Sequence, residues 1–98
     1  MTFELVFTDE ARDNLKKLED DSSKKAILKA VRKTLGLMET NLRHPGLKTH
    51  KYQSIKGPQG EEVFEAYAQN QTSGAYRVFR HYGPEKNQIS IVAIVPHP

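Results

Sequence analysis

The chain has 98 residues, a formal net charge of +3 at pH 7 and no cysteine. This length fits one domain over residues 1–98 with a modest core, and the lack of cysteine excludes disulfides, thiolate metal sites and a cysteine nucleophile. No apolar run approaches the ~18 residues of a membrane span, and the N-terminal stretch lacks the basic start of a signal peptide. We therefore expect a soluble, cytoplasmic protein.

The positive charge lies in the second part of the chain. Residues 1–41 contain eight Lys or Arg and eight Asp or Glu, whereas residues 42–98 contain seven and four. All four histidines (His44, His50, His81 and His97) also lie in the second part. This distribution suggests an anionic partner, nucleic acid or an acidic protein; ordinary scatter of charges is the alternative.

The first 41 residues predict a strand and a helical hairpin. Apolar residues alternate over residues 2–7, as in a half-buried strand. Thr8 suits a helix N-cap, followed by two acidic residues that the helix dipole favours, and the helix should run to about Leu18. After an acidic break, a second amphipathic helix should begin at Ser22 or Ser23 and end near Thr40 or Asn41. We expect these two helices to pack as an antiparallel pair.

Residues 42–51 form an irregular segment, because Pro45-Gly46 excludes regular structure. It is the most basic part of the chain. Its candidates for contacts with phosphate groups, against the alternative of a solvated loop, are Arg43, Lys48, His50 and Lys51.

The rest of the chain predicts strands separated by turns. Residues 52–55 have the character of a short strand, and longer strands are expected over 63–69, 75–82 and 88–95, the last apolar on both faces. The turns between the long strands lie at residues 70–74 and 83–87. The predicted fold class is α+β: an N-terminal strand, a helical hairpin and a three-stranded antiparallel meander, with the helices on one face of a four-stranded sheet and the first strand at its edge.

The strand over residues 75–82 carries more charge than a structural strand needs. Side chains alternate across a strand, so Arg77 and His81 share one face. Arg80 lies on the other face with Tyr76 and Val78, which favours a structural role for it. A fixed cation and an imidazole on one surface suggest chemistry on an anion.

Several stretches resemble the RelE/ParE toxin superfamily of bacterial toxin–antitoxin systems. They are Phe7-Thr8-Asp9-Glu10-Ala11, the leucine-rich helix pair, the strand Gly74-Ala75-Tyr76-Arg77-Val78-Phe79, and the apolar last strand that ends in a histidine. The resemblance covers the layout of the whole chain. It implies a RelE-like fold and favours the RelE-, YoeB- and HigB-like branch of mRNA interferases, which cleave mRNA without a metal, usually on the ribosome.

The resemblance also implies site residues and partners. The family's strand arginine falls on Arg77 and its terminal histidine on His97. Some members have lysines where this chain has Glu65 and Tyr67, and Glu65 is the candidate for the glutamate that some nuclease members use. A toxin implies a cognate antitoxin, with mRNA and the ribosome as further partners. A second branch of the superfamily inhibits DNA gyrase without any chemistry.

Metal-free RNA cleavage requires a base for the 2′-hydroxyl, fixed positive charge at the phosphorus and an acid for the leaving oxygen. Arg77 suits the charge, and the histidines suit proton transfer. The catalytic candidates are Arg77, His97, His81 and Glu65; Glu65, His50 and His81 are the alternatives for the base. Arg77 and Glu65 could instead form a cross-strand structural pair. The histidines lack the spacing of metal ligands, so no metal and no cofactor are expected.

The predicted function is an endoribonuclease toxin, a hydrolase that binds RNA. Two alternatives stand beside it: a ParE-like gyrase inhibitor, and an inactive relative that serves as a binding module.

Overall fold

The structure, a computed structural model, describes residues 2–69 and 74–97. The elements follow one another as β1 (Glu4–Phe7), α1 (Asp9–Glu19), a 3₁₀ turn (Ser22–Lys24), α2 (Lys25–Thr40), a second 3₁₀ turn (Pro45–Leu47), β2 (His50–Lys56), β3 (Glu62–Tyr67), β4 (Tyr76–Tyr82) and β5 (Gln88–Pro96). The turn predicted at residues 70–74 lies, apart from Gly74, outside the described residues.

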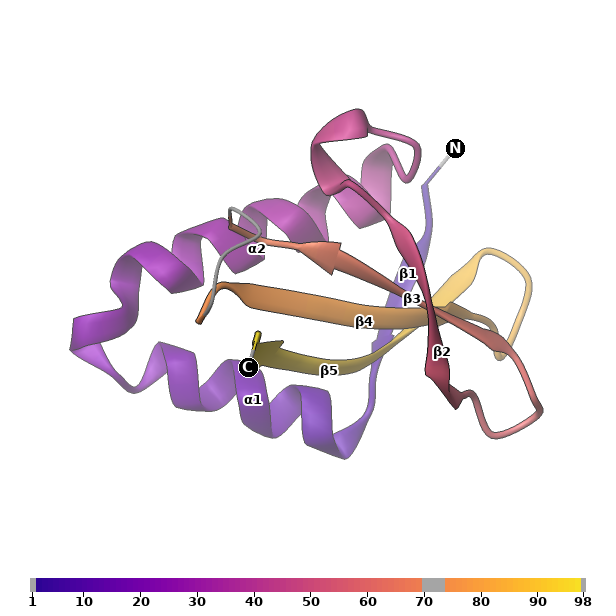
Figure 1. Cartoon of the computed structure of the whole chain (residues 1–98), viewed down its shortest axis with the longest axis horizontal. Helices are drawn as coiled ribbons and strands as arrows, with labels where there is room; N and C mark the ends of the chain where they lie inside the picture. The colour runs from indigo at the N-terminus through magenta and orange to yellow at the C-terminus, as the bar shows by residue number, and fades with distance from the viewer. Residues whose placement is uncertain (1, 70–73, 98) are drawn as a thin grey trace.

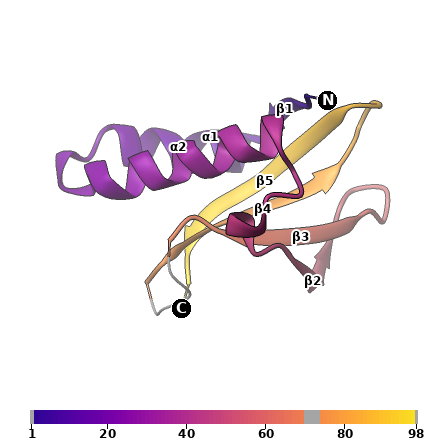
Figure 2. The same cartoon turned by 90° about the horizontal axis from the view of Figure 1, so that it is seen from above.

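The strands form one sheet in the order β1-β5-β4-β3-β2. β1 pairs with β5 in parallel, and the other neighbours are antiparallel. Both helices lie on one face of this sheet, as Figures 1 and 2 show. The α+β class, the helical hairpin and the edge position of the first strand are thereby confirmed.

The expected count of four strands is wrong, because residues 50–56 form a fifth strand. β2 pairs with β3 at His50↔Glu65 and Lys51↔Phe64, then shifts register before Lys56↔Glu62. It is an edge strand, and six of its seven residues are exposed. Strands of this kind need no apolar alternation, so the sequence pattern that marks a strand is nearly absent.

Helix α1 is tied to the last strand by polar side chains. Thr8 caps the helix, since its Oγ1 accepts from the Ala11 N–H at 3.1 Å, as predicted, and the same hydroxyl donates to the Val92 carbonyl at 2.9 Å. One turn on, Asn14 Oδ1 accepts from the Ile94 N–H at 2.9 Å. Because β1 ends at Phe7, these two side chains continue the hydrogen bonding along the outer edge of β5.

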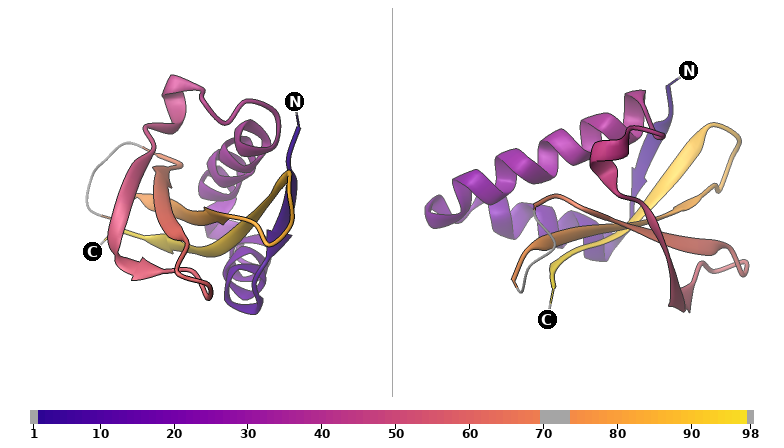
Figure 3. Two further views of the ribbon diagram at one scale, coloured as in Figure 1. Left: turned by 90° about the vertical axis from the view of Figure 1, so that its right-hand side faces the viewer. Right: turned by 45° about the horizontal axis from the view of Figure 1, so that its top comes forward.

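Two apolar clusters lie on opposite faces of the sheet, one of which is covered by the helices, as the ribbons in Figure 3 show. The larger one, on the helix face, joins α1 and α2 to the sheet through residues such as Val31, Met38, Val78 and Ile91. The smaller one, on the face without helices, which we call the open face, consists of Val63, Phe79 and Ala93, with Tyr52 of β2 packed against it. β2 thus covers part of the open face. None of the helices in the described part of the chain is long and apolar enough to cross a membrane.

Candidate active site

Strand β4 presents a buried arginine to each face of the sheet. Val78 belongs to the helix-side cluster and Phe79 to the open-face cluster. Alternation therefore places Arg77 on the open face and Arg80 on the helix face. The sequence predicted that they lie on opposite faces. Both are nearly covered, with exposed fractions of 8% for Arg77 and 3% for Arg80.

Arg77 forms an ion pair on the open face. Its Nη1 lies 3.1 Å from Glu65 Oε2, and both side chains are close to nine-tenths buried. The guanidinium carbon lies 4.7 Å from the ring centre of Phe79 and 5.9 Å from that of Tyr52. The structural pair that the sequence left open is therefore present. Nε of Arg77 is buried, with no hydrogen-bond partner among the described residues.

Two histidines flank this ion pair. His50 is the register partner of Glu65 across β2 and β3, so both side chains point to the open face. His97 lies beside Tyr67, with ring centres 6.1 Å apart, and Tyr67 is in turn the register partner of Arg77. We call Arg77, Glu65, His50, Tyr67 and His97 the open-face cluster. It brings together the predicted cation, two candidate bases and the predicted terminal histidine.

His81 lies away from this cluster. Four residues separate it from Arg77, which amounts to about 13 Å along a strand. Its ring is 5% exposed, and Nδ1 lies 2.8 Å from the Tyr82 carbonyl oxygen and 3.9 Å from Glu61 Oε2. The sequence placed His81 on the correct face, but distance and burial separate it from Arg77.

Most of the basic segment lies on the other side of the sheet. Arg43 and Lys48 line a pocket with Arg80. Lys51 is the register partner of Phe64, which lines the same pocket, so its side chain points to the helix face. Of the four residues that the sequence predicts to bind RNA, only His50 stands beside Arg77 in the described structure.

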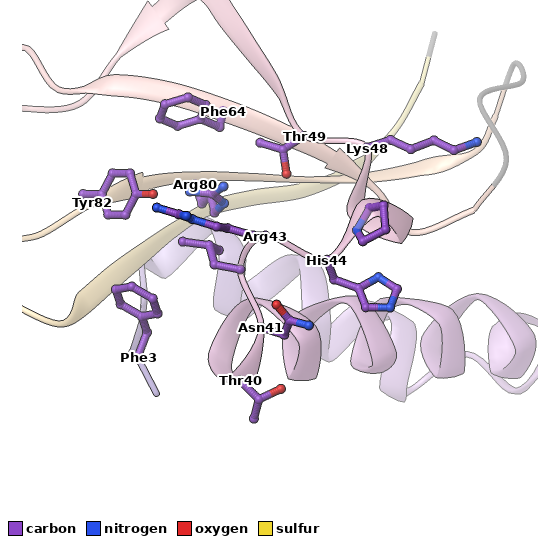
Figure 4. A pocket seen from close by; sticks show the side chains of 12 residues that line it. Phe3, Thr40, Asn41, Arg43, His44, Lys48, Thr49, Phe64, Arg80 and Tyr82 are labelled. Carbon is purple, nitrogen blue, oxygen red and sulfur yellow. The ribbon is translucent and has the colours of Figure 1, made fainter. Parts of the chain in front are cut away.

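This pocket has a volume of about 740 Å³ and lies between the end of α2, residues 41–49 and the strands (Figure 4). Arg80 lines it, with its guanidinium carbon 5.0 Å from the Phe64 ring centre and 5.6 Å from that of Tyr82. Burial lowers the pKa of Arg80, against the opposing influence of Tyr82. Arg80, for which the sequence favours a structural role, takes part in none of the ion pairs of the described residues. The sequence contained a signal for this pocket, because Arg80 is a charged residue on the same strand face as Tyr76 and Val78, which pack in the core.

The open-face cluster has the groups that acid–base chemistry on a phosphodiester needs. Glu65 or His50 can accept a proton, His97 can donate one, and Arg77 supplies a permanent positive charge. Among the described residues, no three His, Asp or Glu side chains are grouped as ligands of a metal ion would be.

Comparison with known proteins gives the fold. No family model matches the sequence, and no curated protein matches it. The dimeric YoeB of Staphylococcus aureus superposes with a TM-score of 0.66 at 16% identity over the full length of both chains. A YoeB/ParE toxin from Agrobacterium tumefaciens gives 0.65 at 11% identity over 98% of this chain and all of that one. The archaeal RelE of a RelE–RelB complex from Pyrococcus horikoshii gives 0.65 at 16% identity, over 98% and 96% of the two chains. The chain therefore has the fold of the RelE/ParE toxins, as its sequence suggested.

Proposed function

We propose that this chain is the toxin of a type II toxin–antitoxin system and an endoribonuclease that cleaves mRNA without a metal ion. The observation that carries the proposal is the open-face cluster, in which Arg77, Glu65, His50 and His97 gather on a fold shared with YoeB and RelE structures. The cluster lies on the face of the sheet that the helices leave uncovered, which suits a substrate as large as mRNA on a ribosome.

In the proposed reaction, Glu65 or His50 takes the proton from a ribose 2′-hydroxyl. The oxygen then attacks the neighbouring phosphorus, and a 2′,3′-cyclic phosphate forms as the bond to the 5′-oxygen breaks. His97 gives a proton to that leaving oxygen, and Arg77 stabilises the charge on the phosphorane oxygens. Arg77 reaches the phosphate when the substrate displaces Tyr52 or Glu65 from its guanidinium.

The test is expression in a bacterial host, with growth followed and mRNA ends mapped. The natural chain should arrest growth and cut mRNA, and His97→Gln should lower the cleavage rate by about 100-fold or more, the usual loss for a general acid. Lys29→Ala on the exposed side of α2 is the control and should cleave normally. Intact mRNA and normal growth with the natural chain would refute the proposal.

The burial of Arg77 favours a second candidate. Its charge is already balanced by Glu65, and Tyr52 and Phe79 lie against it. An arginine held in this way suits a binding module without chemistry, either an inactive relative or a gyrase inhibitor. Loss of DNA supercoiling with mRNA left intact would identify the inhibitor, and no effect on either would identify the inactive module.

A toxin also requires an antitoxin, and the sheet offers a place for one. β2 is an exposed edge strand, so an extended segment of a partner could add to it through main-chain hydrogen bonds. Co-expression with the product of an adjacent gene, followed by purification of a complex, tests this partner. A product that neither binds the chain nor restores growth would exclude that pairing.

A further inference from the structure

The pocket on the helix face contains a buried cation, Arg80, that forms no ion pair with a carboxylate of the described residues. Nε and Nη1 of Arg80 are buried and have no hydrogen-bond partner among the described residues. The neighbouring Phe64 and Tyr82 rings give cation–π contacts, which are worth less than the cost of removing a guanidinium from water. In this respect Arg80 differs from Arg77, whose charge Glu65 balances.

Further positive charge surrounds the same pocket. Arg43 and Lys48 line it together with Arg80, and none of its described lining residues is acidic. His44 also lines it, but its Nδ1 accepts the Gly46 N–H at 2.9 Å, which fits a neutral imidazole. Three fixed cations without a carboxylate suit a ligand that carries more than one negative charge, as a phosphate monoester does.

The walls of the pocket are aromatic. Phe3, Phe64 and Tyr82 line it, and the Phe64 and Tyr82 rings pack against each other next to Arg80, with their centres 6.1 Å apart (Figure 4). Rings of this kind bind a nucleobase by stacking, and the volume of about 740 Å³ lies in the usual range for small-molecule sites. A flat base joined to a phosphate matches both features of the pocket.

We propose that this pocket binds a nucleotide, with its phosphate on Arg80 and Arg43 and its base against the aromatic walls. Arg43 is exposed at the rim and Arg80 is buried below, so the phosphate is held by two guanidinium groups, each able to donate two hydrogen bonds. The same chemistry is offered by a free nucleotide and by the phosphorylated end of an RNA strand. The site lies on the face opposite the open-face cluster and does not depend on the proposed cleavage.

The experiment is calorimetric titration of the purified chain with adenosine 5′-monophosphate, alongside adenosine and inorganic phosphate. The nucleotide should bind more tightly than either part. Arg43→Ala and Arg80→Met should each weaken its binding by about tenfold or more, as loss of a charged hydrogen-bonding partner does. Lys29→Ala, which removes an exposed lysine from α2, should leave binding unchanged.

Folding is monitored for each variant by thermal unfolding. Arg43 is exposed, so its variant tests the site even if Arg80→Met fails to fold. No binding by the natural chain at millimolar nucleotide would overturn the proposal, as would equal binding by the natural chain and Arg43→Ala. Inorganic phosphate binding as tightly as the nucleotide would also overturn it, because the aromatic walls would then contribute nothing.

A second titration, with a short RNA that carries a 5′-phosphate, distinguishes a free nucleotide from the end of an RNA strand as the ligand. Tighter binding than adenosine 5′-monophosphate, lost in Arg43→Ala, supports the end of an RNA strand. Equal or weaker binding supports the free nucleotide. Chemical shift changes should fall on Phe64 and Tyr82; changes confined to Tyr52 and Tyr67 would place the ligand on the open face and refute the assignment.

Discussion

Arg77 and Arg80 lie three residues apart in β4, and their guanidinium groups have different surroundings. Arg77 is paired with Glu65 at 3.1 Å on the open face. Arg80 has aromatic neighbours on the helix face and buried nitrogens without a partner among the described residues. One charge is balanced by a carboxylate and the other is not. Removing the partner of Arg77 should therefore destabilise the fold, whereas removing the charge of Arg80 should not.

Glu65→Gln should destabilise the fold. It leaves Arg77 as an uncompensated buried charge, which typically costs about 3–5 kcal/mol. Urea denaturation measures the loss, and the double variant Glu65→Gln with Arg77→Met should recover most of it because the charge has been removed as well. A change below about 1 kcal/mol for Glu65→Gln would mean that water or a rotated side chain serves Arg77.

Arg80→Met should leave the free energy of unfolding unchanged or raise it. Replacing buried charge by an apolar side chain of similar length is often neutral or stabilising by about 1–4 kcal/mol. The measurement is the same denaturation series. A loss of more than about 2 kcal/mol would show that the contacts of Arg80 with Phe64 and Tyr82 stabilise the fold more than its burial costs.

At the scale of elements, side chains at the start of α1 hydrogen-bond to the backbone of β5 where β1 has ended. Asn14→Ala should lower the free energy of unfolding by about 1–3 kcal/mol, because the partly buried Ile94 N–H then loses its acceptor. Thermal or urea unfolding measures the change. Asp13→Ala, on the exposed side of the same helix, is the matched control and should shift stability by less than about 0.5 kcal/mol.

The elements differ in how far the sequence could predict them. Thr8 predicted the start of α1 because helix capping is a local interaction. Arg77 and Arg80 were correctly assigned to opposite faces because the alternation of side chains along a strand does not depend on tertiary structure. β2 was predicted only as a short strand over residues 52–55 and not as part of the sheet, since an exposed edge strand has little apolar pattern. The positions of Arg43 and Lys48 depend on a loop in which Lys48 adopts a left-handed backbone (φ 46°). No periodicity in the sequence reports such a turn.

The candidate site was only partly predictable for the same reason. Arg77, Glu65 and His97 follow from strands and a resemblance, and the structure brings them to one face. His50 lies opposite Glu65 because of the register between β2 and β3. That register could not be predicted, because the β2 sequence has no clear alternation of apolar residues. His81 shares the correct face but lies about 13 Å along β4 from Arg77, a separation that the strand spacing alone gives.

At the scale of the molecule, the two faces of the sheet should act independently. His97→Gln should abolish cleavage without changing nucleotide binding, and Arg43→Ala should do the reverse. The double variant should show the two losses side by side, because sites without shared contacts give additive effects, usually within about 0.5 kcal/mol. Both activities are measured on each purified variant; loss of nucleotide binding in His97→Gln would show that the faces are coupled.

The place of β5 has a consequence for how the chain is made. β5 lies between β1 and β4, and its backbone accepts a hydrogen bond from the Thr8 hydroxyl and donates one to Asn14 Oδ1. Synthesis proceeds from the N-terminus, so β1 and α1 leave the ribosome long before residues 88–96 exist. A nascent chain that stops short of β5 has no strand beside which β1 can pair, and contacts this distant in sequence form slowly. The open-face cluster, whose His97 follows β5, is therefore assembled only after nearly the whole domain has been translated.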